Sequence, residues 1–541
     1  MKKIIAVLLC LIMTISLLVG CGSKETKKDD GRPVVTIGIP RNATIDDYDT
    51  NAFTVWLEET TGINIEFQFF AAGKSDYASQ LSTMIAGGDK LPDMLWNFSL
   101  GNEVYREYGE YGYFLDLASY YNDPEKGKPF WDRVAELPEE MQNIINENLC
   151  EPGTENIYGL PMLQNSYLDS MEYQVYINQT WLDKLGLDMP TDNASLYNVV
   201  KAFVNNDPNG NGKKDEIGII GSTRSMGSDA ISWLMNLFVN TSEEYWWNVD
   251  ENGQLYLPMM TDKYREALIY VNKLVSEGLM PDTCWSMAAT ELKPLLNPTD
   301  GVNKVGIWCG HPTLILTGEN EAHKEYAALP GWGYQVKNTD SIAKTAFISA
   351  DCENPDLAWE VYLAMTSKEG ALRQRYGKKG VDWDEADEGT KSYIGIDAEI
   401  KVMNPYAYTT GNQTWHAIKA TLLEYPEDEA TQMTDDGGYN SWKLSLVADT
   451  WANFVKQRET LPEVRMPHTI RTQEQSTETE IERDNVQNWI QTMSAKFATG
   501  KDGADPTDDK QWKEYLDEFN KIGYEKWRKQ AQTLYDEQYK K

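Results

Sequence analysis

The chain is poor in histidine and has none of the common catalytic motifs. Only four histidines occur among 541 residues, and none of them forms the His-Glu-x-x-His pattern of zinc hydrolases. A Gly-x-Ser-x-Gly nucleophile motif and a glycine-rich phosphate loop are also absent. Paired carboxylates are the usual machinery of glycosidases, but 84 acidic residues place many such pairs close together by chance. The sequence therefore argues against an enzyme, and a secreted polysaccharide hydrolase is the less favoured alternative.

Basic residues are also scarce. There are 50 Lys and Arg against 84 Asp and Glu, which gives a formal net charge of -34. Such a charge repels nucleic acid and anionic membrane surfaces, so we expect neither as a binding partner. The chain is 41% hydrophobic and 11% aromatic, so we expect it to fold despite its acidity. Its length predicts two or more domains.

Cysteine is rare, with six in the whole chain. Two lie in or beside the N-terminal leader, and the other four are far apart: Cys150, Cys284, Cys309 and Cys352. Their spacing fits no zinc pattern, and it leaves open whether they pair or stay free.

Residues 1–20 have the features of a secretory signal peptide. Two lysines precede the apolar run Ile4–Val19, and a glycine stands directly before Cys21. A positive start, a short apolar segment and a small residue are typical of a cleaved signal, and the junction resembles the lipobox of bacterial lipoproteins. That resemblance implies that Cys21 becomes the lipidated first residue, with residues 21–33 as a flexible tether. A signal anchor that is never cleaved is the alternative.

Oxygen-bearing side chains alternate around glycines in residues 207–216. They stand at the first, third and fifth positions of an EF-hand-type calcium loop, and Gly212 occupies the sixth. Position twelve is Gly218 instead of the usual Glu, so the remaining oxygens would come from earlier acids. We predict a structural Ca²⁺ site with these ligands: Asp207, Asn209, Asn211, the Lys213 carbonyl, Asp215 and Glu216. An ordinary Asn/Gly/Asp turn is the alternative.

The folded part of the chain begins with alternating strand and helix patterns. Val34–Ile39 and Ile63–Phe70 have the composition or alternation of strands, and Tyr77–Ala86 has apolar residues at helical spacing. This alternation of strands and helices predicts an α/β lobe with a largely parallel sheet. Apolar residues also recur at helical spacing in Tyr264–Leu279, and two such patterns separated by a glycine fill Trp512–Tyr535.

Several short segments, taken in order, resemble the extracellular solute-binding proteins of family 1, the carbohydrate importer class. They are Gly87–Asp93, Tyr158–Pro161, Trp181–Leu187, the loop 207–216 and Glu277–Pro281. The resemblance implies a two-lobed α/β fold of the periplasmic-binding-protein type (type II), with a hinged cleft between the lobes. It places lobe 1 at residues 34–165 plus 347–400 and lobe 2 at residues 166–346 plus 401–541.

The resemblance also implies a function. We expect a receptor that is held by lipid on Cys21 at the outer face of the bacterial cytoplasmic membrane. It would close around an oligosaccharide and deliver it to the permease of an ABC transporter. A receptor of the same fold for a peptide or another small solute is the main alternative.

Tryptophans beside polar or glycine residues are the candidate sugar contacts. Flat aromatic side chains cover the C–H faces of a sugar, and planar polar groups bind its hydroxyls. Trp96 and Asn97 follow an expected strand end, Trp308 follows a β-rich run, and Trp415 ends Gly411–Trp415, segments that distantly resemble maltose-binding proteins. Further candidates are Arg41, Asn165, Tyr167 and Trp233. Plain core packing is the alternative for each tryptophan.

Overall fold

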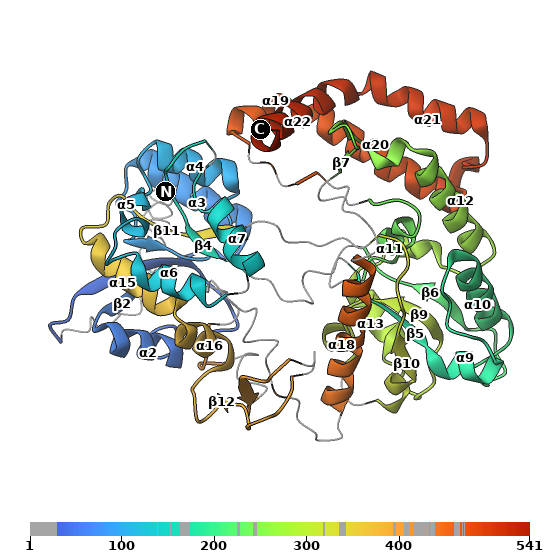
Figure 1. Cartoon of the computed structure of the whole chain (residues 1–541), viewed down its shortest axis with the longest axis horizontal. Helices are drawn as coiled ribbons and strands as arrows, with labels where there is room; N and C mark the ends of the chain where they lie inside the picture. The colour runs from blue at the N-terminus through green and yellow to red at the C-terminus, as the bar shows by residue number, and fades with distance from the viewer. Residues whose placement is uncertain are drawn as a thin grey trace, which may run out of the picture.

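Two separate β-sheets, each covered by helices, form the framework of the protein (Figure 1). The computed structural model describes residues 30–137, 139–151, 153–162, 173–223, 228–241, 246–317, 320–334, 342–392, 396–404, 411–415, 432, 439–458, 466–467, 469 and 471–540. Figure 1 shows one sheet with its helices on the left and the other on the right. We call these parts the first and second lobe.

The first sheet has the strand order β2-β1-β3-β11-β4 among the described residues. β1 pairs in parallel with β2 and β3, whereas β11 runs antiparallel to β3 and β4. The strands are β1 (Val34–Pro40), β2 (Asn64–Phe70), β3 (Met94–Leu95), β4 (Leu160–Met162) and β11 (Ala343–Ile348). The helices of this lobe are α2 (Ala52–Thr61), α3 (Lys74–Gly87), α4 (Asn102–Glu110), α5 (Ala118–Tyr121), α6 (Lys128–Ala135), α7 (Glu139–Asn148), α15 (Pro355–Thr366) and α16 (Lys368–Tyr376).

Successive residues of these strands point to opposite faces of the sheet, and each face has its own core. Met94 packs in the core that includes residues of α2 and α15, whereas Leu95 packs in the core that includes residues of α3. Ile348 and Phe347 on β11 divide in the same way. The sheet is therefore buried on both faces, as expected for an α/β lobe. It is less parallel than predicted from the sequence, because the pairs of β11 with β3 and β4 are antiparallel.

The second sheet has the order β10-β5-β9-β6 among the described residues, with β6 and β9 parallel. Its strands are β5 (Val175–Asn178), β6 (Ile217–Ile220), β9 (Val305–Cys309) and β10 (Tyr326–Ala328). A short hairpin of β7 (Asn248–Val249) and β8 (Leu255–Tyr256) lies in the same lobe. The helical segments are α9 (Gln179–Leu185), α10 (Asn193–Asn205), α11 (Ala230–Asn236), η1 (Pro258–Met260), α12 (Asp262–Ser276), η2 (Asp282–Trp285), α13 (Ala289–Leu296), α14 (Pro312–Ile315), η3 (Glu321–Glu325) and α18 (Tyr439–Arg458).

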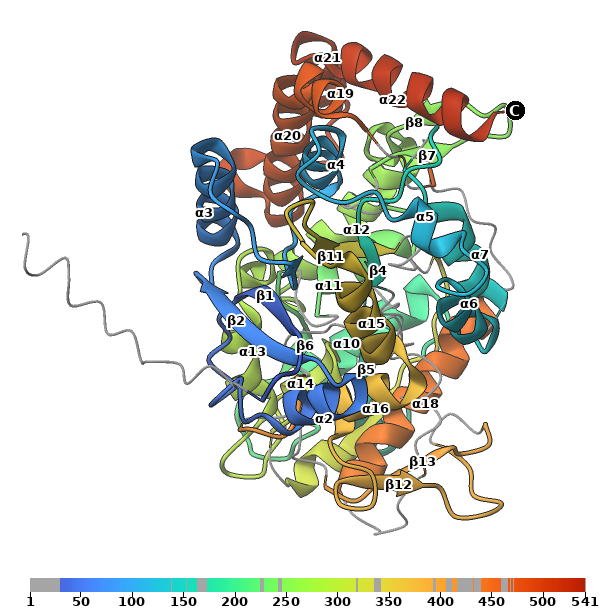
Figure 2. The same cartoon turned by 90° about the vertical axis from the view of Figure 1, so that its left-hand side faces the viewer.

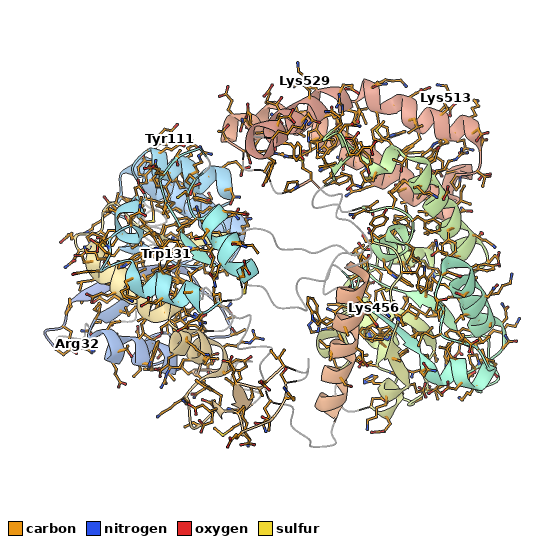
Figure 3. All side chains as sticks on the ribbon, in the orientation of Figure 1. Arg32, Tyr111, Trp131, Lys456, Lys513 and Lys529 are labelled. Carbon is orange, nitrogen blue, oxygen red and sulfur yellow. The ribbon has the colours of Figure 1, made fainter. Side chains whose placement is uncertain are left out.

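The end of the chain adds a layer of helices to the second lobe (Figure 2). It consists of α19 (Gln473–Glu478), α20 (Glu480–Thr499), η5 (Lys501–Gly503), α21 (Asp509–Lys521) and α22 (Tyr524–Tyr539). α20 packs along α12, where the hydroxyls of Tyr264 and Ser494 lie 2.7 Å apart. Lys513 on α21 and Lys529 on α22 project outward from this layer (Figure 3).

The helices predicted from periodicity are present. α12 buries Tyr264, Leu268 and Val271 on one face, and Thr261 caps its N-terminus by accepting a hydrogen bond from the Tyr264 amide. α21 and α22 fill the two patterns near the end of the chain, separated by Gly523, whose φ of 98° ordinary residues rarely adopt. These expectations are confirmed.

Strand pairing differs from the predicted lobe boundaries at two places. All of β11 belongs to the first sheet, although the prediction divides it after residue 346. β13 (Ile400–Val402) pairs with β12 (Trp383–Glu385), and Gly411 forms a bridge with Ile45. Where they are described, residues 401–415 therefore pack with the first lobe, whereas the prediction assigns them to the second. None of the helices in the described ranges combines the length and apolar character needed to cross a membrane.

Candidate functional site

Two predicted polar contacts lie at the carboxyl ends of neighbouring strands of the first sheet. Arg41 directly follows β1 and is exposed, with its guanidinium carbon 5.0 Å from the centroid of the Phe69 ring. Asn97 lies just beyond β3 and has a φ of 64°, a backbone region that asparagine enters more readily than most residues. Because β1 and β3 are parallel, both residues share one sheet edge, where α/β sheets commonly bind ligands. Their contact with a ligand stays a prediction.

The predicted tryptophans of the first lobe lie inside its core. Trp96 is 1% exposed and Trp415 is fully buried. The Trp415 Nε1 donates a hydrogen bond to Thr54 Oγ1 at 3.1 Å, and the Phe53 and Phe67 rings lie 5.2 and 5.6 Å from the Trp415 ring. The alternative of core packing therefore describes both indoles in this structure, and their contact with a ligand stays a prediction.

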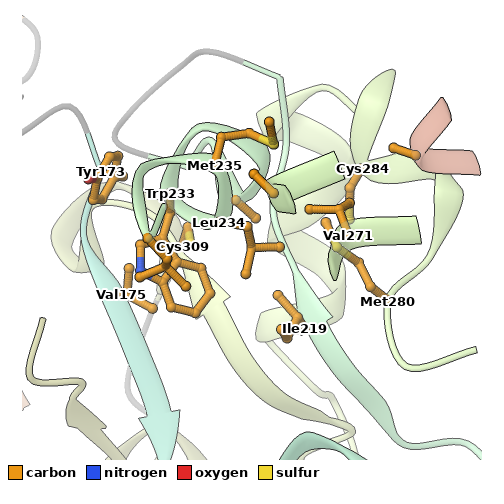
Figure 4. Close-up of a cluster of buried hydrophobic side chains, with 14 of the residues drawn as sticks. Tyr173, Val175, Ile219, Trp233, Leu234, Met235, Val271, Met280, Cys284 and Cys309 are labelled. Carbon is orange, nitrogen blue, oxygen red and sulfur yellow. The ribbon is translucent and has the colours of Figure 1, made fainter. Parts of the chain in front are cut away.

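The predicted tryptophans of the second lobe are buried in the same manner. Trp308 on β9 is fully buried, with its ring 4.6 Å from the Tyr176 ring. Trp233 on α11 is 3% exposed and belongs to the same core cluster as Val175 and Cys309 (Figure 4). The structure thus places Trp96 with Trp415 in one core and Trp233 with Trp308 in another.

Three predicted residues, Cys21, Asn165 and Tyr167, lie outside the described residues, so their roles stay predictions. The four cysteines within the described ranges, at positions 150, 284, 309 and 352, are all free. Burial raises the pKa of Cys284 to about 11, which keeps this thiol protonated and unreactive at neutral pH.

The predicted calcium loop forms a tight turn that its own side chains stabilise. Asp207 has a φ of 47°, and its carboxylate accepts hydrogen bonds from the backbone N–H groups of Asn211 at 3.1 Å and Gly212 at 2.9 Å. The Asn211 side-chain oxygen accepts from the Lys213 N–H at 2.8 Å. The side-chain oxygens at the first and fifth positions are therefore held by the backbone of the turn, between the end of α10 and the start of β6.

Two further carboxylates of the loop differ in their surroundings. Asp215 accepts from Asn211 Nδ2 at 2.9 Å and pairs with Lys304 at 3.1 Å, and the Asn211 bond followed by Lys304 lowers the pKa of Asp215. Glu216 is 9% exposed, and its Oε1 is buried without a hydrogen-bond partner among the described residues. Burial, and then the charge of Asp207, raises the pKa of Glu216. A bound cation would relieve this cost of burying a carboxylate.

The donor set of the loop fits Ca²⁺ better than a smaller or softer metal. Within the described ranges, no three His, Cys, Asp or Glu side chains are grouped to hold a metal ion, so a cation would also need the amide oxygens of Asn209 and Asn211 and a backbone carbonyl. Such a mixture of six or more oxygens is the environment that calcium prefers.

A cavity of about 290 Å³ lies in the second lobe between α11, α12, η2 and α20. Aromatic, aliphatic, sulfur-containing and small polar side chains form its walls, and none of these residues was predicted as a ligand contact. Its aromatic and polar lining residues include Asp229, Ser232, Thr241, Trp246, Tyr264 and Trp285.

Comparison with known proteins decides the family. Residues 41–372, more than half of the chain, match the bacterial extracellular solute-binding proteins. The chain is a bacterial extracellular solute-binding protein. The predicted family and its two-lobed α/β fold are thereby confirmed.

Relatives resemble this solute-binding protein over almost its full length. The fructooligosaccharide ABC transporter substrate-binding protein FusA of Streptococcus pneumoniae is 21% identical over 97% of each chain. An extracellular solute-binding protein from Bifidobacterium longum subsp. infantis shares its fold, with a TM-score of 0.74, 21% identity and coverage of 95% of this chain and 100% of the other. Two structures of FusA, one in complex with kestose and one of an EF-hand mutant in complex with fructo-nystose, each have a TM-score of 0.63. Their identities to this chain are 20% and 19%, and both alignments cover 93% of this chain and 99% of FusA.

The residues of the second-lobe cavity carry little signal in the sequence. Tyr264 belongs to the apolar stripe of α12, where core packing explains it. Trp285 lies in a short 3-10 segment, and Asp229 is the N-cap of α11. Only the packing of α20, more than 200 residues further along the chain, brings these side chains around one space.

Proposed function

We propose that this solute-binding protein captures an oligosaccharide between its two lobes and delivers it to the permease of an ABC transporter. The observation that carries this proposal is the similarity to a fructooligosaccharide-binding relative over 97% of both chains. Exposed Arg41 and partly buried Asn97 at the edge of the first sheet support it, because a planar guanidinium and an amide suit sugar hydroxyls. We expect binding without turnover of the sugar.

The calcium loop has a structural task in this proposal. Asp207, Asn209, Asn211, Asp215 and Glu216 would hold the ion together with the Lys213 carbonyl. The ion would supply positive charge to a buried carboxylate, and these residues would fix the turn between α10 and β6. The unpaired Glu216 Oε1 supports this assignment.

The location follows from the N-terminal leader. Cleavage before Cys21 and lipidation of its thiol would tether the protein to the outer face of the cytoplasmic membrane, with residues 22–33 as a spacer. Replacement of Cys21 by serine should release the protein from cells into the medium, and retention of the C21S variant in the membrane fraction would contradict a lipid anchor.

A binding assay on the lipid-free protein tests the function. We would express residues 22–541, screen a glycan array, and measure the affinity of each hit by isothermal titration calorimetry. Micromolar or tighter binding of an oligosaccharide, with no new products by chromatography after prolonged incubation, is the expected result. Binding of peptides without any glycan would overturn the sugar assignment, and release of shorter sugars would favour the hydrolase.

A further inference from the structure

We propose that the cavity between α11, α12, η2 and α20 is a subsite that receives one ring of the oligosaccharide. This assignment rests on the proposed function, since it places part of the same ligand. The volume of about 290 Å³ is just below the range of about 300 to 1,000 Å³ for small-molecule sites. It therefore suits a single sugar unit and not a whole oligosaccharide.

Aromatic side chains supply the apolar part of the cavity wall. Trp246, Tyr264 and Trp285 all line it, and their flat faces can cover the C–H groups of a sugar ring. Trp246 is 7% exposed and has a φ of 55°. A left-handed backbone is uncommon for a bulky side chain, and such conformations concentrate at ligand-binding sites.

Small polar groups supply the hydrogen-bonding part. Asp229, Ser232 and Thr241 line the cavity, and the Asp229 carboxylate is held by the Ser232 N–H at 2.9 Å and the Ser232 hydroxyl at 2.7 Å. These bonds fix the carboxylate as the N-cap of α11. A mixture of aromatic faces and a few fixed polar groups is the usual lining of a sugar site.

Trp285 brings an indole N–H donor to the cavity. Its Nε1–H is buried and has no hydrogen-bond acceptor among the described residues. A buried indole N–H normally finds a partner, because leaving a donor unpaired costs about 1 to 3 kcal/mol. A sugar hydroxyl accepted into the cavity could supply the acceptor after a small rotation of the ring.

The cavity lies where an α/β lobe usually binds its ligand. Thr223 follows the carboxyl end of β6, and Asp229 begins the helix after it. Ligands of open α/β sheets bind beyond the carboxyl ends of the strands. α20 closes the opposite wall with Ile490, Ser494 and Ala495, so the C-terminal helices become part of the binding site.

The first test places a large side chain in the cavity by a substitution on α20. Ala495 is half-buried on α20, so Ala495→Trp can occlude the space with little strain on the core. We expect Ala495→Trp to weaken binding more than about tenfold, because the ligand loses the contacts of one sugar ring. Thr492→Trp is the matched control, because Thr492 is exposed on α20 and lies outside the cavity, and it should bind as the unmodified protein does. The probes are neutral gluco-, fructo-, galacto- and manno-oligosaccharides measured by titration calorimetry, with circular dichroism and melting curves to establish that each variant is folded.

A second pair of variants tests the unpaired donor. Trp285→Phe keeps a ring and removes the Nε1–H, so we expect affinity to fall about three- to tenfold. Trp489→Phe is its control, since Trp489 lies on α20 outside the cavity and donates to the Tyr515 carbonyl. If the unmodified protein binds glycans and both Ala495→Trp and Trp285→Phe bind them equally well, the subsite is wrong while the proposed function stands. If the unmodified protein binds no glycan, both fail.

Discussion

Lys344 Nζ on β11 donates a hydrogen bond to Glu151 Oε1 at 2.6 Å, and the two side chains are only 3% and 1% exposed. Lys344 also donates to the Leu149 carbonyl at 2.7 Å, and the Tyr105 hydroxyl donates to the other Glu151 oxygen at 3.4 Å. Burial lowers the pKa of Lys344. β11 pairs with β4, and these are the strands of the first sheet nearest in sequence to the second lobe. The ion pair therefore joins β11 to the segment before β4 inside the first lobe.

Removing one partner of this ion pair should destabilise the folded protein. We expect Lys344→Met or Glu151→Leu alone to lower the free energy of unfolding by about 3 to 5 kcal/mol, because each leaves a buried charge without its partner. The double variant should lose much less than the sum, since two apolar groups replace two charges. Urea unfolding of the four proteins in a double-mutant cycle measures this. Additive losses would show that the two residues are energetically independent.

Chelation of Ca²⁺ should change the stability of the protein more than its affinity for sugar. Removal of Ca²⁺ should lower the melting temperature, because an ion present at 100 times its Kd stabilises the folded state by about 2.7 kcal/mol. Glu216→Gln should abolish the response to chelator, since it removes a charge that the ion would neutralise. Asp505→Asn is the control, because Asp505 caps an exposed turn outside the loop. A larger effect of chelation on sugar affinity than on melting would place the loop in the ligand site instead.

Truncation of the buried tryptophans should destabilise the protein. Trp96, Trp308 and Trp415 are each at most 1% exposed, so alanine at any of them should cost about 3 to 5 kcal/mol through the cavity it leaves. If these tryptophans also contact the sugar as predicted, each alanine variant should lose affinity for the sugar as well as stability. Melting curves and calorimetry on the same variants separate the two effects. Wild-type melting together with weak binding would move the residue from the core to the ligand site.

One hydrogen bond joins the two lobes directly. Ser476 on α19 donates to Glu103 Oε1 on α4 at 2.8 Å, and Figure 2 shows α4 directly below α19. We expect Ser476→Ala to loosen this contact, so that small-angle X-ray scattering of the ligand-free protein gives a larger radius of gyration. Thr533→Ala, which removes an exposed hydroxyl bonded within α22, is the control. Identical scattering of both variants would mean that the contact does not restrain the lobes.

Local patterns in the sequence determined several helices and the turn at residues 207–216. The spacing of apolar residues located α12, α21 and α22, because helical periodicity places a buried stripe on one face whatever that face meets. The alternating oxygens of residues 207–216 predicted a calcium loop, with an ordinary turn as the alternative. The structure shows a turn in which short polar side chains bond their own backbone.

Only the tertiary structure decided which of the predicted tryptophans lie in a core. Trp415 donates to Thr54, 361 residues away, and the second-lobe cavity needs Thr223, Trp285 and Ala495 from three separate segments. The surroundings of a tryptophan depend on residues that are distant in the sequence. Its neighbours along the chain indicate only that it can be buried. The turn at residues 207–216 could be recognised from ten consecutive residues because its hydrogen bonds are local. The packing of Trp96, Trp308 and Trp415 could not, because chain folding brings their neighbours together.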